Sequence, residues 1–192
     1  MNPKISILTV PIALSENPLW MSFVAGNESA LEDVYQTYFN RLYTYGYKYV
    51  AKKELVESAL TSLFTNLLNN RKPTQEQLLL KLHLFKTLRE ILSDKVNECK
   101  ACAPAKELLH QQFELELDIV KPAAGEPDNV LAEVLEQFTP RQREVLYLLY
   151  KENFSMHDIA LIMHLSDQEV LKYAERAGYS MRTNYYNMQK IS

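Results

Sequence analysis

The chain has 192 residues, a net charge of -3, and 47% hydrophobic against 23% charged residues. That length accommodates one ordinary domain or two small ones, and that composition is usual for a globular protein. The net charge shows that the chain is not strongly basic. A freestanding DNA-binding protein, in contrast, usually carries a basic stripe that neutralises phosphates. If DNA is a partner, we therefore expect another component to supply much of the affinity.

Residues 1–17 contain a short apolar run that faintly resembles a secretion signal. Pro11 interrupts the run, and Ser15-Glu16-Asn17 follows where a signal peptide needs small residues for cleavage. No other stretch approaches about 20 apolar residues, the length that a membrane-spanning helix needs. We expect a loosely packed tail, a cytoplasmic protein and no membrane insertion.

The next segments, within residues 18–102, have the period of amphipathic helices. Apolar residues recur three and four positions apart from Leu31 to Tyr49, in "KKELVESALTSLFTNLLNNR", and in "LLLKLHLFKTLREILSDKVNECK". The tyrosines of the first segment could be imagined as a stacking platform for bases, but at helical spacing we favour a role in the core. The chain has only four glycines and no long alternation of period two, so we predict an all-α fold.

Residues 103–128 change in character and are expected to join two domains. They contain prolines and more acids than lysines, and their end lies within "KPAAGEPDN", which has the composition of a linker. Just before them, Cys99 and Cys102 form a C-x-x-C pair. A zinc site would need two further ligands and a redox pair a neighbouring strand, so we favour two reduced thiols and expect no metal or cofactor.

Residues 129–192 carry three helix starts that can be read from local chemistry. Thr139 can cap a helix with Pro140 in its first turn and Gln142 completing a capping box. Ser155 with Asp158 and Ser166 with Glu169 repeat this pattern, which predicts two further helices joined by a tight turn. The apolar positions expected to face inwards are Val145, Leu148, Leu149, Ile159, Ile162, Met163, Val170, Ala174 and Ala177.

Two short helices joined by a tight turn are typical of a DNA-binding helix-turn-helix. The first turn of the second helix, however, contains acidic residues. Asp167 and Glu169 stand in its first turn, where the helix dipole and free N–H groups favour negative charge. The same positions reach base edges in a helix-turn-helix, where an acid can accept from cytosine and Gln168 can pair with adenine. The sequence is compatible with both roles.

Both helical blocks resemble bacterial RNA polymerase sigma factors of the small extracytoplasmic-function (ECF) group. The fourth conserved region of that family is similar to "LEQFTPRQREVLYLLYKENFSMHDIALIMHLSDQEVLKYAERA". The second conserved region is similar to "LWMSFVAGNESALEDVYQTYFNRLYTYGYKYV" and "ELVESALTSLFTNLLNNR". Together these stretches cover nearly the whole folded chain in the family's order.

The resemblance implies two all-helical domains on a flexible linker, no enzymatic activity, and core RNA polymerase and promoter DNA as partners. It also leaves room for an anti-sigma factor. Polymerase would then supply most of the DNA affinity of this slightly acidic chain. The residues implied to bind polymerase are Glu57, Ser58 and Thr61. Those implied to contact DNA are Lys86, Arg89, Arg141, Gln168, Glu169, Lys172, Tyr173 and Arg176.

The chain departs from the family pattern mainly on these binding faces. Ser58 stands where Asp is preferred, Thr61 where Gln is preferred, and Leu68 where Trp is usual. A second hypothesis is therefore a degenerate sigma-like regulator that binds polymerase or a regulatory protein without reading promoters. An enzyme has little support, because no phosphate loop, nucleophile elbow or H-E-x-x-H motif is present.

Overall fold

The computed structural model describes residues 18, 21–23, 27–69, 80–98 and 138–175, and all regular structure within these ranges is helical. The predicted all-α fold is therefore confirmed for this part of the chain. The predicted tail at 1–17, the joint at 103–128, the Cys99–Cys102 pair, Arg176 and Ala177 all lie outside the described residues.

Three helices form the first block: α2 (Glu28–Val50), α3 (Lys53–Asn69) and α4 (Leu80–Glu98). Asn27 caps α2 by accepting a hydrogen bond from the Ser29 N–H, and Ala51 ends it in the left-handed region at φ 51°. The turn between α2 and α3 is short, and a Cβ at Gly46 would lie only 3.1 Å from the Val56 side chain. Gly46 therefore permits the close approach of these two helices.

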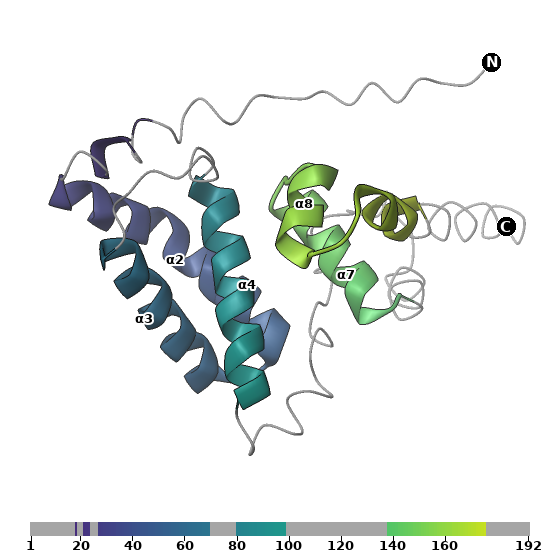
Figure 1. The fold of residues 1–192 in the computed structure, drawn as a ribbon, viewed down its shortest axis with the longest axis horizontal. Helices are drawn as coiled ribbons and strands as arrows, with labels where there is room; N and C mark the ends of the chain where they lie inside the picture. The colour runs from purple at the N-terminus through teal and green to yellow at the C-terminus, as the bar shows by residue number, and fades with distance from the viewer. Residues whose placement is uncertain (1–17, 19–20, 24–26, 70–79, 99–137, 176–192) are drawn as a thin grey trace, which may run out of the picture.

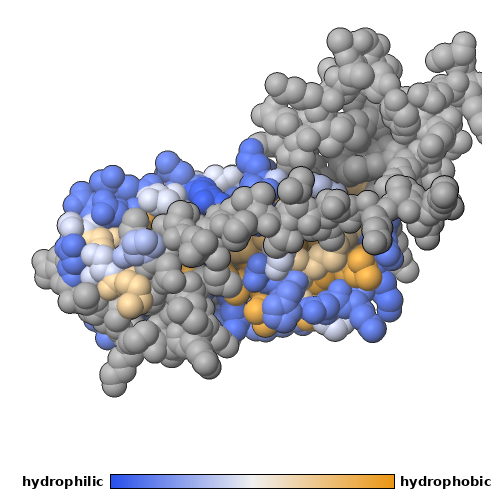
Figure 2. Space-filling view, turned by 90° about the horizontal axis from the view of Figure 1, so that it is seen from above, coloured by the Kyte–Doolittle hydropathy of each residue, from blue (hydrophilic) through white to orange (hydrophobic). Residues whose placement is uncertain are grey.

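The core of this block follows the predicted period, with two differences. Tyr38, Leu42, Tyr45 and Tyr49 of α2 are buried, as their spacing predicts. Tyr35 is instead exposed, and its ring lies 4.7 Å from that of Phe39 and 5.0 Å from that of Phe64. Leu68 is also exposed, whereas Leu67 is buried. Hydrophobic patches lie among hydrophilic residues on the face that Figure 2 shows.

The second block consists of α7 (Pro140–Leu146), the π-helical turn η4 (Tyr147–Lys151), α8 (Met156–Met163) and a helix at 167–175. Thr139 and Gln142 form the predicted capping box at the start of α7, and Ser155 and Asp158 form the one at the start of α8. Most positions predicted to face inwards are buried, and Leu149 and Ala174 are partly buried.

The two blocks pack against each other through α4, which lies between α2 and α3 on one side and α8 on the other (Figure 1). Their buried residues form one continuous core. At its centre the ring of Phe85 meets that of Phe154 edge-on at 5.2 Å, and the rings of Tyr45 and Tyr147 stack at 6.2 Å. Sequence periodicity locates each block's apolar face but does not reveal this shared core. The domain boundaries themselves stay a prediction.

Candidate nucleic-acid interface

The helix at 167–175 and α8 have the geometry of a helix-turn-helix. His164 caps the C-terminus of α8: it adopts the left-handed conformation at φ 53° and donates its backbone N–H to the Ala160 carbonyl. Only Leu165 and Ser166 separate this cap from the next helix. Val170 is completely buried. The turn and this single buried anchor together hold the outer face of the second helix towards solvent.

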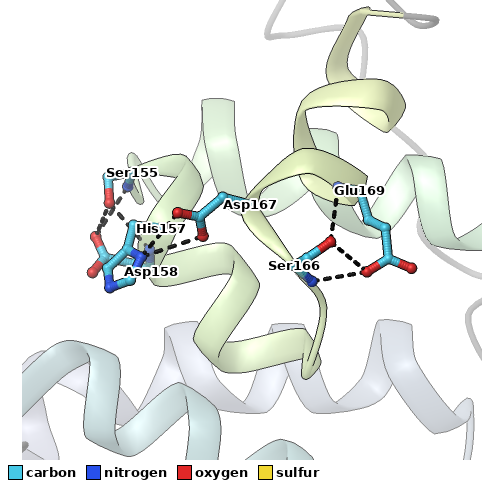
Figure 3. A network of polar contacts seen from close by, with 6 residues as sticks. All are labelled: Ser155, His157, Asp158, Ser166, Asp167 and Glu169. Atoms are coloured by element: carbon cyan, nitrogen blue, oxygen red, sulfur yellow. Dashed lines mark hydrogen bonds and ion pairs between the residues drawn. The ribbon is translucent and has the colours of Figure 1, made fainter.

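A capping box fixes the first turn of this helix (Figure 3). The Glu169 carboxylate accepts hydrogen bonds from the Ser166 N–H at 2.8 Å and from the Ser166 hydroxyl at 2.7 Å. The Ser166 hydroxyl accepts in turn from the Glu169 N–H at 3.3 Å. The Ser166 backbone bond, then its hydroxyl, lowers the pKa of Glu169, so this carboxylate is ionised at neutral pH. Helix capping therefore accounts for Glu169 without any DNA contact.

Asp167 has a different local partner. Its carboxylate oxygens both lie 3.3 Å from Nδ1 of His157, a residue of α8, and both side chains are exposed (Figure 3). This contact crosses the turn between the two helices. Asp167 therefore stabilises the turn when it accepts a hydrogen bond from Nδ1 of His157, as well as carrying negative charge at the helix start.

Several residues predicted to contact DNA do share one exposed face. Gln168, Glu169 and Lys172 are exposed on the helix at 167–175, and Arg141 is exposed at the start of α7. After the hydrogen bonds from Ser166, the charges of Lys172 and Arg141 also act to lower the pKa of Glu169. Tyr173 is only partly exposed because it packs against the core. Asp167 is exposed in the same first turn, so the surface around Gln168 mixes two cations with two acids.

Arg89, which the resemblance places on DNA, lies instead in the contact between the two blocks. Its side chain is 12% exposed, and its Nε lies 2.9 Å from the fully buried Glu144 carboxylate of α7. Its guanidinium also lies 5.2 Å from the centre of the Tyr49 ring. Burial acts to lower the pKa of Arg89, but Glu144 together with Tyr45 and Tyr49 outweighs it and raises the pKa overall, so the side chain is charged. In this arrangement Arg89 is not available to DNA. Lys86, the other α4 residue that the resemblance implies contacts DNA, is partly exposed.

Tyr45, Arg89 and Glu144 form a first buried cluster. The Tyr45 hydroxyl donates to the Glu144 carboxylate at 2.8 Å. Burial, followed by the charge of Glu144, raises the pKa of Tyr45 well above its usual range, so the hydroxyl keeps its proton. Glu144 is thus held by a cation and a neutral donor from two different helices of the first block.

A second cluster surrounds Glu152, the residue after η4. Its carboxylate lies 2.6 Å from Nη2 of Arg41 and 4.0 Å from Nζ of Lys81, and it accepts from the Tyr147 hydroxyl at 3.3 Å. Lys81 also donates to the backbone carbonyl of Glu152 and lies 4.3 Å from the centre of the Phe154 ring. Sequence reasoning missed both clusters, because their partners are far apart in the chain and each charge taken alone resembles a solvated one.

The three residues predicted to bind polymerase do lie together on an exposed stretch of α3. Thr61 donates its hydroxyl to the Glu57 carbonyl, and Ser58 accepts from Lys95 of α4 at 2.9 Å. Glu57 lies 3.6 Å from Lys53, and both are exposed, at 53% and 64% respectively. The stretch is polar and exposed, as the rim of a protein–protein interface is.

Comparison of the sequence with family models and with curated proteins finds no match to either. In the described ranges no group of three or more histidine, cysteine, aspartate or glutamate side chains could hold a metal ion. None of the helices described is both long and apolar enough to cross a bilayer.

Proposed function

We propose that this protein is an ECF-type sigma factor that binds core RNA polymerase and directs promoter recognition in the cytoplasm. The observation that carries the proposal is the outward-facing helix at 167–175, which α8, a short turn and the buried Val170 hold in helix-turn-helix geometry. The same chain carries a three-helix block whose α3 presents an exposed polar stretch. Both features lie where the sequence resembles the family's fourth and second regions.

The charge of the molecule agrees with this proposal when polymerase supplies the affinity. The exposed surface around Gln168 carries the cations Arg141 and Lys172 and the acids Asp167 and Glu169. By itself it would therefore gain little DNA affinity from neutralising phosphates. A base contact is still worth about 1–3 kcal/mol in discrimination once a partner holds the helix in the major groove. The proposed role is thus selection among promoters rather than tight independent binding.

The test of polymerase docking is co-purification of core RNA polymerase with Glu57→Arg and with a matched control, Glu32→Arg. Each residue is the fifth of its helix, each is exposed, and each has a partner four residues away in its own helix, Lys53 or Gln36. We expect Glu57→Arg to lose polymerase and Glu32→Arg to retain it, with unchanged helical content in both. Equal recovery of polymerase with the two variants would contradict docking through α3.

A second candidate function is a sigma-like regulator that binds polymerase without reading promoters. The burial of Arg89 against Glu144 favours it, because a residue that the resemblance places on DNA is already paired. So does the use of Glu169 in a cap. This candidate predicts the same α3 docking but no specific start sites.

A further inference from the structure

Four aromatic rings follow one another along α2, each four residues after the last: Tyr35, Phe39, Tyr43 and Tyr47. Successive ring centres lie 4.7, 6.1 and 6.4 Å apart. The rings at the two ends, Tyr35 and Tyr47, are 44% and 41% exposed, and the two between them are partly exposed. We call this row the aromatic ladder of α2. It presents to solvent an apolar surface that the core does not use.

The part of α2 that carries the ladder lacks the charged residues usual on a solvated helix face. Of residues 34–47 only Arg41 is charged, and its Nη2 lies 2.6 Å from the Glu152 carboxylate. The other exposed positions hold amides and hydroxyls: Gln36, Thr37, Asn40 and Thr44. Pairing of rings four residues apart stabilises a helix slightly, but it does not account for the missing charges. Exposed aromatic rings with few charges around them are typical of the centre of a protein–protein interface.

Charges of opposite sign flank this uncharged part of α2. Glu32 and Asp33 are exposed before it, and Lys48 and Lys52 are partly exposed after it. Acids at the start and bases at the end of a helix suit its dipole. They also make α2 complementary to a second α2 that runs in the opposite direction, because each acidic end then meets a basic end. A parallel copy would bring like charges together.

We propose that this face of α2 joins two copies of the chain in an antiparallel dimer with two-fold symmetry. The ladder is centred on position 41. The symmetry therefore places Tyr35 opposite Tyr47 of the second copy, and Phe39 opposite Tyr43 of the second copy. Such a contact uses the same patch on both copies, so a surface complementary to itself is sufficient.

The size of this face indicates a weak, reversible dimer. From residue 32 to residue 48 the contact extends about 24 Å at the rise of an α-helix. α3 widens it at one end, where the ring of Phe64 lies 5.0 Å from that of Tyr35 and Leu68, one turn further along α3, is 41% exposed. The face is still smaller than a standard protein interface, so we expect a Kd on the order of 10 μM.

Sedimentation velocity of the full chain, under reducing conditions and from about 1 to 100 μM, tests the dimer. The forms compared are wild type, Tyr47→Glu and, as a matched control, Tyr150→Glu, which replaces an exposed tyrosine outside α2. Circular dichroism checks that all three have the same helical content. We expect wild type and Tyr150→Glu to dimerise alike. Tyr47→Glu should raise the Kd at least about tenfold, because it removes a central ring and adds an acid facing Glu32 and Asp33 of the second copy.

A wild type that stays monomeric throughout this range, or equal Kd values for the two variants, would overturn the dimer. A monomeric wild type whose Tyr47→Glu form loses core polymerase would assign the face to polymerase and would likewise overturn it. The sedimentation experiment contains neither polymerase nor DNA. Failure of the dimer therefore leaves the proposed function standing, and failure of polymerase docking leaves the dimer standing.

Exchange of charges tests the antiparallel arrangement. Asp33→Lys should weaken the dimer, because it brings a third cation to Lys48 and Lys52 of the second copy. Adding Lys52→Asp should restore the Kd most of the way to the wild-type value. Positions 33 and 52 lie at opposite ends of α2 within one copy, so restoration must act between copies. If Lys52→Asp fails to restore the dimer, the antiparallel arrangement is wrong.

Discussion

Replacing Arg89 by methionine leaves the Glu144 carboxylate buried without its cation. The pair is deeply placed, with side-chain exposures of 12% and 0% and an Nε–Oε1 distance of 2.9 Å. Breaking a buried ion pair by removing one partner typically costs about 3–5 kcal/mol, because the remaining charge is desolvated. Tyr45 still donates to Glu144 at 2.8 Å, so we expect a loss near the lower end, about 3 kcal/mol.

The assay is urea unfolding of wild type, Arg89→Met, Glu144→Gln and the double variant, which together form a double-mutant cycle. An amide at position 144 can still accept from Tyr45 and carries no charge, so the double variant should recover most of the lost free energy of unfolding. If Arg89→Met separates the blocks instead, Glu144 reaches water. The loss is then smaller, and the dependence on urea becomes shallower because less surface remains to be exposed.

The control is Lys53→Met, which breaks the exposed ion pair with Glu57 at 3.6 Å. Surface pairs contribute about 0–1 kcal/mol, so this variant should stay close to wild type. If Arg89→Met is as stable as Lys53→Met, and its transition in urea is equally steep, then the Arg89–Glu144 pair does not hold the blocks together and the reasoning fails.

Two further predictions concern pH. Burial raises the pKa of Tyr45 and, less strongly, of Tyr49, so the unfolded chain loses these protons first on titration with base. Their contribution to stability is complete below about pH 10, the ordinary tyrosine value, and is lost as pH rises above it. The free energy of unfolding should fall in that range less steeply for Tyr45→Phe than for wild type, and equal slopes would contradict the burial argument. At the other end, Ser166 lowers the pKa of Glu169, so this carboxylate stabilises the fold above the unfolded value of about 4.3 and ceases to do so as pH falls through the folded value. Carboxyl NMR titration should show the pKa of Glu169 moving up towards normal in Ser166→Ala, and an unmoved pKa would show that the hydroxyl plays no part.

Sequence alone predicted the features of this protein that depend on neighbouring residues. The three capping boxes, led by Thr139, Ser155 and Ser166, use residues three positions apart, so their chemistry is visible in the letters. The buried stripes of α2 and α8 follow from helical period. The same rules explain the acids at the start of the helix at 167–175. In a helix-turn-helix these are also the positions that reach base edges.

The contacts between the blocks could not be predicted in this way. Arg89 and Glu144 are 55 positions apart, and Arg41 and Glu152 are 111 apart. Glu144 and Arg89 each stand on a helix of mixed charge, which usually faces water. The packing of the second block against α2 and α4 removes them from solvent. A resemblance to a family places Arg89 on a helix, but it does not say what that helix meets in the free chain.

In vitro transcription with purified core RNA polymerase, over a library of upstream regions, tests the proposed function most directly. We expect the wild-type protein to produce a limited set of specific start sites. Gln168→Ala should change which promoters are used, whereas Lys172→Ala should lower output across them, because phosphate contacts carry no sequence information. Polymerase that binds the protein but starts at no specific site would contradict promoter recognition and favour the non-reading regulator.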